Sequence, residues 1–166
     1  LEANITRGLK FRQNIGFNYG SNTRDQYYPT TVYEGFSVKG WGLKADNLWT
    51  SFVSESILSY NKKMKRHNVT LTGASTFERT NGQWKRAEAK TFPNDLLQNE
   101  NLQAGEQIMP VIGSRYQSTL ISFLGRAQYG FDDRYLITTS YRRDGSSKFG
   151  TNNKWAGFAS AGLAWK

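Results

Sequence analysis

The sequence predicts an all-β fold, an antiparallel up-and-down meander of about six strands. Apolar and polar residues alternate with period two over strand-length runs, and tight and long connections alternate between those runs. No apolar run approaches the roughly 18 residues of a membrane-spanning helix. The clearest alternation lies in 120–166. There the odd positions carry apolar residues such as Ile121, Phe123, Tyr129 and Ile137, and the even positions carry polar ones such as Arg126, Gln128, Thr138 and Arg142. A helix could not place those apolar residues on one side, so a sheet with one apolar and one polar face is expected.

Six runs are predicted as strands: 9–19, 48–60, 67–80, 120–131, 134–143 and 155–165. In the first run, Leu9, Phe11, Ile15 and Phe17 oppose Lys10, Arg12, Asn14 and Asn18. In the second run, Phe52 and Leu58 share a side while Trp49, Val53 and Ile57 lie opposite, so its facing stays open.

Long connections are predicted at 20–47, at 81–118 and after the fifth strand, where Asp144-Gly145 indicates a hairpin turn. A short helix is expected inside 81–118, with Asn94 as its cap, Gly105 as its stop and Leu96, Leu97 and Leu102 along it. Tight turns are predicted at 61–66 and at Asp132-Asp133. Alternate connections of a meander leave from opposite edges, so the three long connections are expected on one side.

The composition suits a sheet that shows an apolar face to a nonpolar medium. Only 37% of the 166 residues are hydrophobic, yet 14% are aromatic. A β-barrel span needs only about 9–11 alternating residues, and outer-membrane barrels combine short turns at one end with long loops at the other. The alternative is a soluble meander packed on another domain.

The net charge of +9 admits anionic partners, and a soluble nucleic-acid-binding β-module is a second alternative. The basic residues are scattered, however, apart from the cluster Lys62-Lys63-Met64-Lys65-Arg66. Scattered charge argues against nucleic acid as a partner.

An enzyme is not expected. The chain has one histidine and no cysteine, and it lacks a Gly-rich phosphate loop, a nucleophile elbow and an HExxH pattern. His67 begins a strand beside a turn, and Asp132-Asp133 has no further acidic ligands nearby in the sequence. We therefore expect no catalytic residue, no metal site and no cofactor.

One segment resembles a known family. The run Arg142-Arg143-Asp144-Gly145-Ser146-Ser147-Lys148-Phe149-Gly150, followed by Asn152-Asn153-Lys154-Trp155, resembles a signature of SusC/RagA-type TonB-linked outer-membrane proteins. Further similarities follow in family order along the chain, at 8–12 with 16–19, 25–29, 92–95 with 101–105, and 124–126 with 135–136. The chain departs from the family at Phe158-Ala159-Ser160, where Phe-Pro-Ser is common, and this puts only a local kink in doubt.

The resemblance implies an open, curved segment of a large, plugged transmembrane β-barrel of 22 strands. We expect residues 1–166 to form a partial barrel domain, with the plug domain, the TonB-contacting segment and the remaining strands outside it. Family members import oligosaccharides or peptides across the outer membrane of Gram-negative bacteria. Their partners are a SusD-like surface lipoprotein, the TonB complex, the plug of the same chain and the lipid bilayer. A TonB-dependent receptor for iron chelates (siderophores) is the alternative within this reading.

Candidate site residues follow from the predicted positions. Trp41, Trp84, Arg115 and Tyr116 fall in the predicted long loops, and loops on a rigid scaffold commonly carry binding, so they are candidates for substrate contact. Arg126 and Arg142 share the even, polar face and are candidates for facing the lumen and pairing with plug carboxylates. On strands one and three to six, the odd face is expected to meet lipid and the even face to meet water and the plug.

Overall fold

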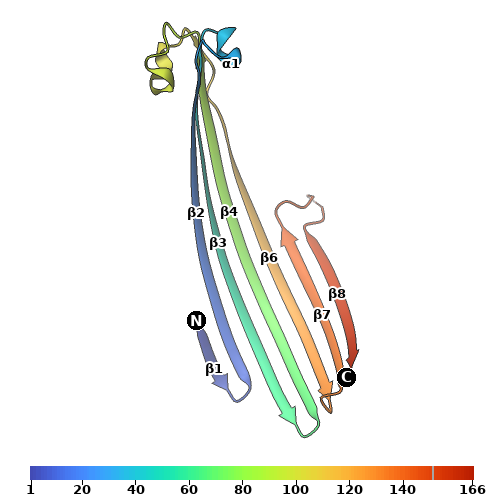
Figure 1. Ribbon diagram of the computed structural model, residues 1–166. Coiled ribbons are helices and arrows are strands. Elements are labelled where there is room, and N and C mark those ends of the chain that lie inside the picture. The colour runs from blue at the N-terminus through green and yellow to red at the C-terminus, as the bar shows by residue number, and fades with distance from the viewer. Residues whose placement is uncertain (151) are drawn as a thin grey trace. The chain divides into compact units, whose positions relative to one another are not determined.

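The computed structural model describes residues 1–150 and 152–166, and its strands form one open antiparallel sheet (Figure 1). The strand order is β1-β2-β3-β4-β6-β7-β8, and β5 pairs with β4 off this path. The strands are β1 (Glu2–Thr6), β2 (Leu9–Tyr28), β3 (Trp41–Met64), β4 (His67–Lys90), β5 (Gln107–Ile108), β6 (Ile112–Phe131), β7 (Tyr135–Ser146) and β8 (Trp155–Trp165). The predicted antiparallel meander is confirmed, but the number of strands is eight rather than six because of β1 and β5.

The chain divides into two units, of which unit 1 comprises residues 1–18, 51–80 and 118–166. The register pairs Tyr129 with Ile137 and Ile137 with Leu163, so the odd positions of β6, β7 and β8 share one face. This apolar face is open: Phe123 is 50% exposed and Leu163 is 82% exposed. Among the described residues of unit 1, no apolar side chain is buried. Unit 1 therefore has no core of its own.

The facing of β3 within unit 1, left open by the sequence, is decided by contacts across the strands. The ring centroids of Phe52 and Phe77 lie 6.4 Å apart, and the Gln13 side chain donates to the Ser54 hydroxyl at 3.0 Å. Even positions of β3 therefore share the apolar face with odd positions of β2 and β4. Ile57, on the opposite side, is one of the apolar residues on the polar face.

Unit 2 comprises residues 19–50 and 81–117 and contains the buried apolar side chains Leu43, Ala89 and Phe92. It also contains the one-turn helix α1 (Tyr33–Phe36) and the 3-10 helix η1 (Gln98–Ala104). Phe92 packs edge-on against Tyr27, with ring centroids 5.4 Å apart. Among the described residues, neither helix is long and apolar enough to cross a membrane.

The Asp95 carboxylate joins the two long connections of unit 2. It accepts hydrogen bonds from the Tyr27 hydroxyl at 2.6 Å and from the Thr30 hydroxyl at 2.8 Å. The bond from Tyr27, followed by the bond from Thr30, holds the pKa of Asp95 below its ordinary value. The connection after β4 is thereby attached to the end of β2.

The predicted long loops are shorter than expected, because β2 continues to Tyr28, β3 begins at Trp41, β4 continues to Lys90 and β6 begins at Ile112. These strand segments carry polar side chains on both faces, so the hydrophobic alternation that marks a half-buried strand is lost. Their ladder hydrogen bonds join backbone atoms and persist without that pattern.

Two local predictions in the connections were also wrong in part. The helix in 81–118 is a 3-10 helix whose N-cap is Leu97, while the Asn94 side chain accepts a hydrogen bond from the Leu96 N–H at 3.1 Å. Gly105 ends the helix, as predicted. Asp144-Gly145 is not a turn: both residues lie in β7, because β6 and β8 pair with it on both sides through these positions. The connection runs instead from 147 to 154.

Candidate substrate-contact face

Five aromatic side chains lie on one face of unit 2, which we call the aromatic face: Tyr28, Trp41, Trp49, Trp84 and Tyr116. Trp41 stacks on Tyr28 with ring centroids 5.0 Å apart, and its indole N–H donates to Glu88 at 2.9 Å. Glu88 and Trp84 are four residues apart on β4, and side chains at even spacing along a strand share a face. Trp84 therefore lies on the same face as Trp41.

Two further rings of the aromatic face, those of Tyr116 and Trp49, each lie against a glycine. A Cβ at Gly82 would overlap the ring of Tyr116, and a Cβ at Gly20 would overlap the ring of Trp49. Gly82 is two residues from Trp84 on β4, so the Tyr116 ring lies beside Trp84 on this face. Trp84 is 41% exposed and Tyr116 is 51% exposed, which leaves both rings open to a ligand.

Charged and hydrogen-bonding groups border the aromatic face. The Nε of Arg86 lies 2.5 Å from Glu88 in an ion pair, and the Lys90 ammonium lies 5.5 Å from the centre of the Trp41 ring. Arg24 donates to the Gln26 side chain at 2.7 Å, and Gln26 in turn donates to the Tyr28 hydroxyl. Rings flanked by such groups can contact the apolar face of a sugar or a peptide side chain while polar groups orient it.

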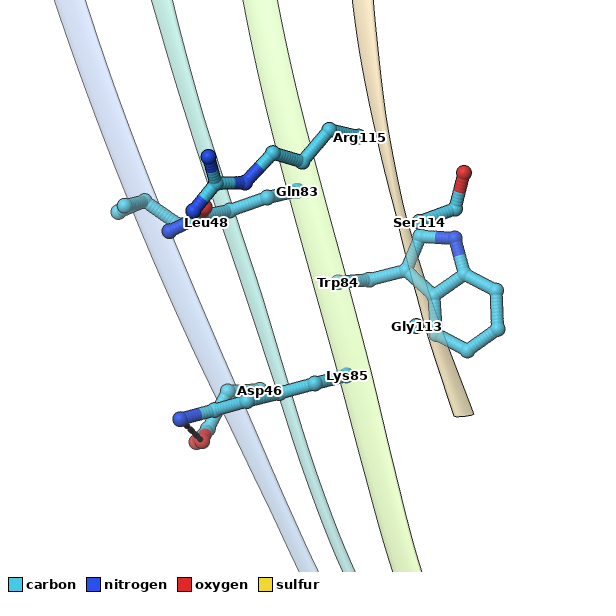
Figure 2. Close-up of a pocket in the computed structure, with 8 residues that line it drawn as sticks. All are labelled: Asp46, Leu48, Gln83, Trp84, Lys85, Gly113, Ser114 and Arg115. Carbon is cyan, nitrogen blue, oxygen red and sulfur yellow. Dashed lines mark ion pairs between the residues drawn. The ribbon is translucent and has the colours of Figure 1, made fainter. Parts of the chain in front are cut away.

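Arg115 belongs to a different surface of unit 2. It lines a groove of about 500 Å³ that Trp84 also borders, and Figure 2 shows Arg115 and Gln83 reaching toward Leu48 while the Trp84 ring points away from them. The same groove contains the ion pair between Lys85 and Asp46, at 3.4 Å. The rings of three of the four predicted candidates thus share one face, whereas the Arg115 side chain lies on the opposite side of its strand.

All four candidates lie in strands, contrary to the prediction that they fall in loops. Trp41 begins β3, Trp84 lies in β4, and Arg115 and Tyr116 lie in β6. Sequence reasoning missed Tyr28, Trp49 and the pair Arg86–Glu88 as members of this surface. The available signal was an aromatic residue on one strand matched by a glycine on the next, but the pairing register is needed to see it.

Arg126 and Arg142 lie on the polar face of unit 1, as predicted: Arg126 pairs with Ser140, and Arg142 pairs with Leu124 two positions along the ladder. The Arg142 Nε donates to Asp144 at 2.7 Å. Arg126 has no side-chain partner among the described residues. Their role toward a plug stays a prediction.

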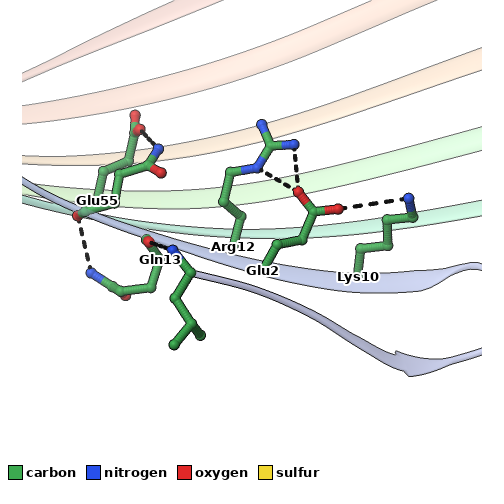
Figure 3. A network of polar contacts seen from close by, with 7 residues as sticks. Glu2, Lys10, Arg12, Gln13 and Glu55 are labelled. Carbon is green, nitrogen blue, oxygen red and sulfur yellow. Dashed lines mark hydrogen bonds and ion pairs between the residues drawn. The ribbon is translucent and has the colours of Figure 1, made fainter.

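The polar face of unit 1 extends across the sheet to β1. Figure 3 shows Glu2 between Arg12 and Lys10, with N···O separations of 2.8 Å and 3.7 Å. The Asn14 amide donates to Glu55 at 2.9 Å on the same face. Across the described residues, no group of three or more His, Asp or Glu side chains is arranged to hold a metal ion.

Proteins similar in sequence to this chain include two TonB-dependent receptors. TonB-dependent receptor P3 of Formosa agariphila is 32% identical over 158 residues, which cover 95% of this chain and 16% of that protein. TonB-dependent receptor SusC of Bacteroides thetaiotaomicron is 46% identical over 50 residues, 30% of this chain and 5% of that protein. The structure of the RagAB peptide transporter matches 98% of this chain with a TM-score of 0.85.

The chain is a β-barrel segment of the SusC/RagA-type TonB-dependent family. The RagAB match covers 18% of that chain at 23% identity, so by itself it shows the fold. This SusC/RagA-type segment spans about a sixth of the length of TonB-dependent receptor P3. No protein-family model matches it.

Proposed function

We propose that the full-length protein is an active transporter in the outer membrane of a Gram-negative bacterium, and that it imports oligosaccharides or peptides. We further propose that TonB energises it and that a SusD-like surface lipoprotein is its partner. The observation that carries the proposal is the similarity of nearly the whole chain to a TonB-dependent receptor, together with the fold it shares with the RagAB peptide transporter.

The two faces of unit 1 support a place in the wall of a membrane barrel. The apolar face exposes large side chains such as Phe123, and we assign it to the lipid bilayer, a medium in which such side chains are stable. The polar face carries Arg126 and Arg142, and we assign it to the lumen, where plug carboxylates would meet these guanidinium groups.

The aromatic face of unit 2 is the surface that we assign to substrate contact. Its open rings, Trp84 and Tyr116, offer large apolar area with little side-chain entropy to lose, and Arg86 and Glu88 offer polar groups close by. Both a sugar ring and a peptide side chain fit this chemistry. Arg115 lies outside this assignment because its side chain points to the other side of its strand.

The test uses the full-length gene in a strain from which it has been deleted, with uptake of oligosaccharides, peptides and iron chelates measured separately. We expect oligosaccharide or peptide uptake to require both this protein and a functional TonB. Growth on iron chelates alone would instead identify a siderophore receptor and overturn the proposed substrate class.

Point variants test the aromatic face. Trp84→Ala is expected to weaken binding of the transported substrate several-fold to about tenfold, because an aromatic contact contributes about 0.5–1.5 kcal/mol beyond its buried area. Arg115→Ala, on the neighbouring strand but outside the aromatic face, is the matched control and should leave affinity within twofold. Equal losses in the two variants would refute the assignment of the aromatic face.

A further inference from the structure

Six basic side chains gather at the tight turns of unit 1, and we call them the basic rim: Arg7, Lys62, Lys63, Lys65, Arg66 and Arg134. The cluster from Lys62 to Arg66 is visible in the sequence, but the fold adds residues from two other turns. Nothing in the proposed transport function uses these residues. All six side chains are exposed, and each of the three tight turns of unit 1 carries at least one of them.

Backbone hydrogen bonds hold the three turns next to one another. The Asn61 N–H donates to the Gly8 carbonyl at 2.7 Å, and the Asp132 N–H donates to the Arg66 carbonyl at 2.7 Å. Gly8 has φ of +82°, and a Cβ there would overlap the Asn61 carbonyl oxygen, so this approach requires glycine. The basic side chains of separate turns therefore form one continuous rim.

Acidic residues neutralise only part of the basic rim. Arg66 forms a two-point contact with Asp132, with its Nε at 2.9 Å, and Lys63 lies 3.6 Å from Asp133. Across the described residues, these are the only ion pairs of the rim. The side chains of Arg7, Lys62, Lys65 and Arg134 remain exposed and without an acidic partner, so the rim carries a net positive charge.

A row of rings borders the basic rim on the apolar face. The Arg66 guanidinium lies 4.9 Å from the centre of the Phe131 ring, and Phe131 stacks on Tyr135 with centroids 6.5 Å apart. Tyr135 pairs in register with Trp165, and both rings are exposed. Aromatic rings between an apolar surface and a charged one are typical of a membrane–water interface.

We propose that the basic rim binds the phosphate groups of anionic phospholipids in the membrane leaflet at the tight-turn end of the barrel. This inference rests on the proposed function, because it needs the apolar face of unit 1 to meet a bilayer. A bilayer suits the rim because apolar surface, rings and cations follow one another in the order of acyl chain, interface and headgroup. Nucleic acid or an anionic polysaccharide could bind the basic rim, but neither would contact the apolar face on the other side of the rings.

The experiment reconstitutes the full-length protein in phosphatidylcholine vesicles with a trace of spin-labelled phosphatidylglycerol or spin-labelled phosphatidylcholine. The motionally restricted fraction of each label gives the preference of the protein for the anionic lipid. The rim variant carries Arg7→Gln, Lys62→Gln and Arg134→Gln. The matched control carries Lys39→Gln, Lys148→Gln and Lys154→Gln, which removes the same charge from the long connections.

We expect the wild type and the control to prefer the anionic lipid. The rim variant should lose at least fivefold of that preference, because it lacks three basic residues and each one near an anionic surface changes association by about fivefold. Arg7→Lys, Lys62→Arg and Arg134→Lys together should restore it. Inorganic phosphate at constant ionic strength should not abolish the preference; if it does, the rim takes free phosphate and not lipid.

Equal preference in the rim variant and the wild type overturns the inference. Restricted phosphatidylcholine shows that each variant is inserted in the bilayer, so a misfolded variant is recognised directly. If no label is restricted by the wild type, the membrane placement itself fails. Normal substrate uptake by a protein without anionic preference would refute the lipid inference alone.

Discussion

Neighbouring residues of β2 provide a sharp test of which face of unit 1 meets lipid. Ile15 is 69% exposed on the apolar face, and Asn14 lies on the polar face, where its amide contacts Glu55. Arginine at either position has the same depth along the strand. The substitutions Ile15→Arg and Asn14→Arg therefore differ only in the face that receives the charge.

The expected cost follows from the position of Ile15 in β2. Six residues separate it from Leu9, at the beginning of the strand, and a rise of about 3.3 Å per residue places it roughly 20 Å along the strand. With a strand tilt of about 40°, this is roughly 15 Å of height, close to the middle of an apolar band about 25 Å tall. Arginine facing lipid at that depth costs about 2–4 kcal/mol. Asn14→Arg can pair with Glu55 and should change stability by less than about 1 kcal/mol.

The assay is equilibrium denaturant unfolding of the full-length protein reconstituted in lipid vesicles. Ile15→Arg should lower the unfolding midpoint clearly, and Asn14→Arg should leave it nearly unchanged. Ile15→Ala measures the loss of the apolar side chain alone and is subtracted. Equal destabilisation by the two arginines, or a larger effect at Asn14, would refute the facing of the sheet.

Further predictions concern unit 2 and the edge of unit 1. Gly82→Ala should displace the Tyr116 ring and lower substrate affinity as far as Tyr116→Ala does, and an unaltered affinity in isothermal titration would contradict this. The pKa of Asp95 lies below its ordinary value because of the hydrogen bond from Tyr27, so its ionised form stabilises the attachment of the two connections above about pH 4. That contribution is lost as the pH falls through the lowered pKa, and amide exchange in 91–111 should rise there in the wild type but be fast already at neutral pH in Asp95→Ala. Trp155→Ala removes the ring beneath the Arg143 guanidinium and should lower the free energy of unfolding by about 0.5–1 kcal/mol in the same assay. Trp155→Phe keeps an aromatic ring and should lower it less.

Much of unit 1 could be predicted from sequence because one face of its strands is apolar. The alternation of Ile121, Phe123 and Tyr129 against Arg126 and Gln128 has the period of the sheet, and the structure places both sets as predicted. The runs 9–19 and 67–80 were found for the same reason. Where both faces carry apolar side chains, as around Phe52, the pattern was ambiguous, and only contact with Phe77 decided the facing.

The site was predicted less well than the fold. Trp41, Trp84 and Tyr116 were chosen because aromatic residues in loops often bind ligands, yet they lie in strands. Their common face depends on the register of β3, β4 and β6, and residues far apart in sequence set that register. The seating of Tyr116 on Gly82 joins two strands in the same way, and no local pattern reports it.

The sequence by itself determined the β-meander, the apolar face of unit 1, the family signature that begins at Arg142 and the absence of the usual enzyme motifs. These are properties of local periodicity and residue type. Only the tertiary structure decided how far the polar strands extend, that Asp144 and Gly145 are strand and not turn, and which turns unite in the basic rim. The physical reason is that backbone ladders and turn-to-turn hydrogen bonds join segments distant in sequence and need no apolar pattern to form.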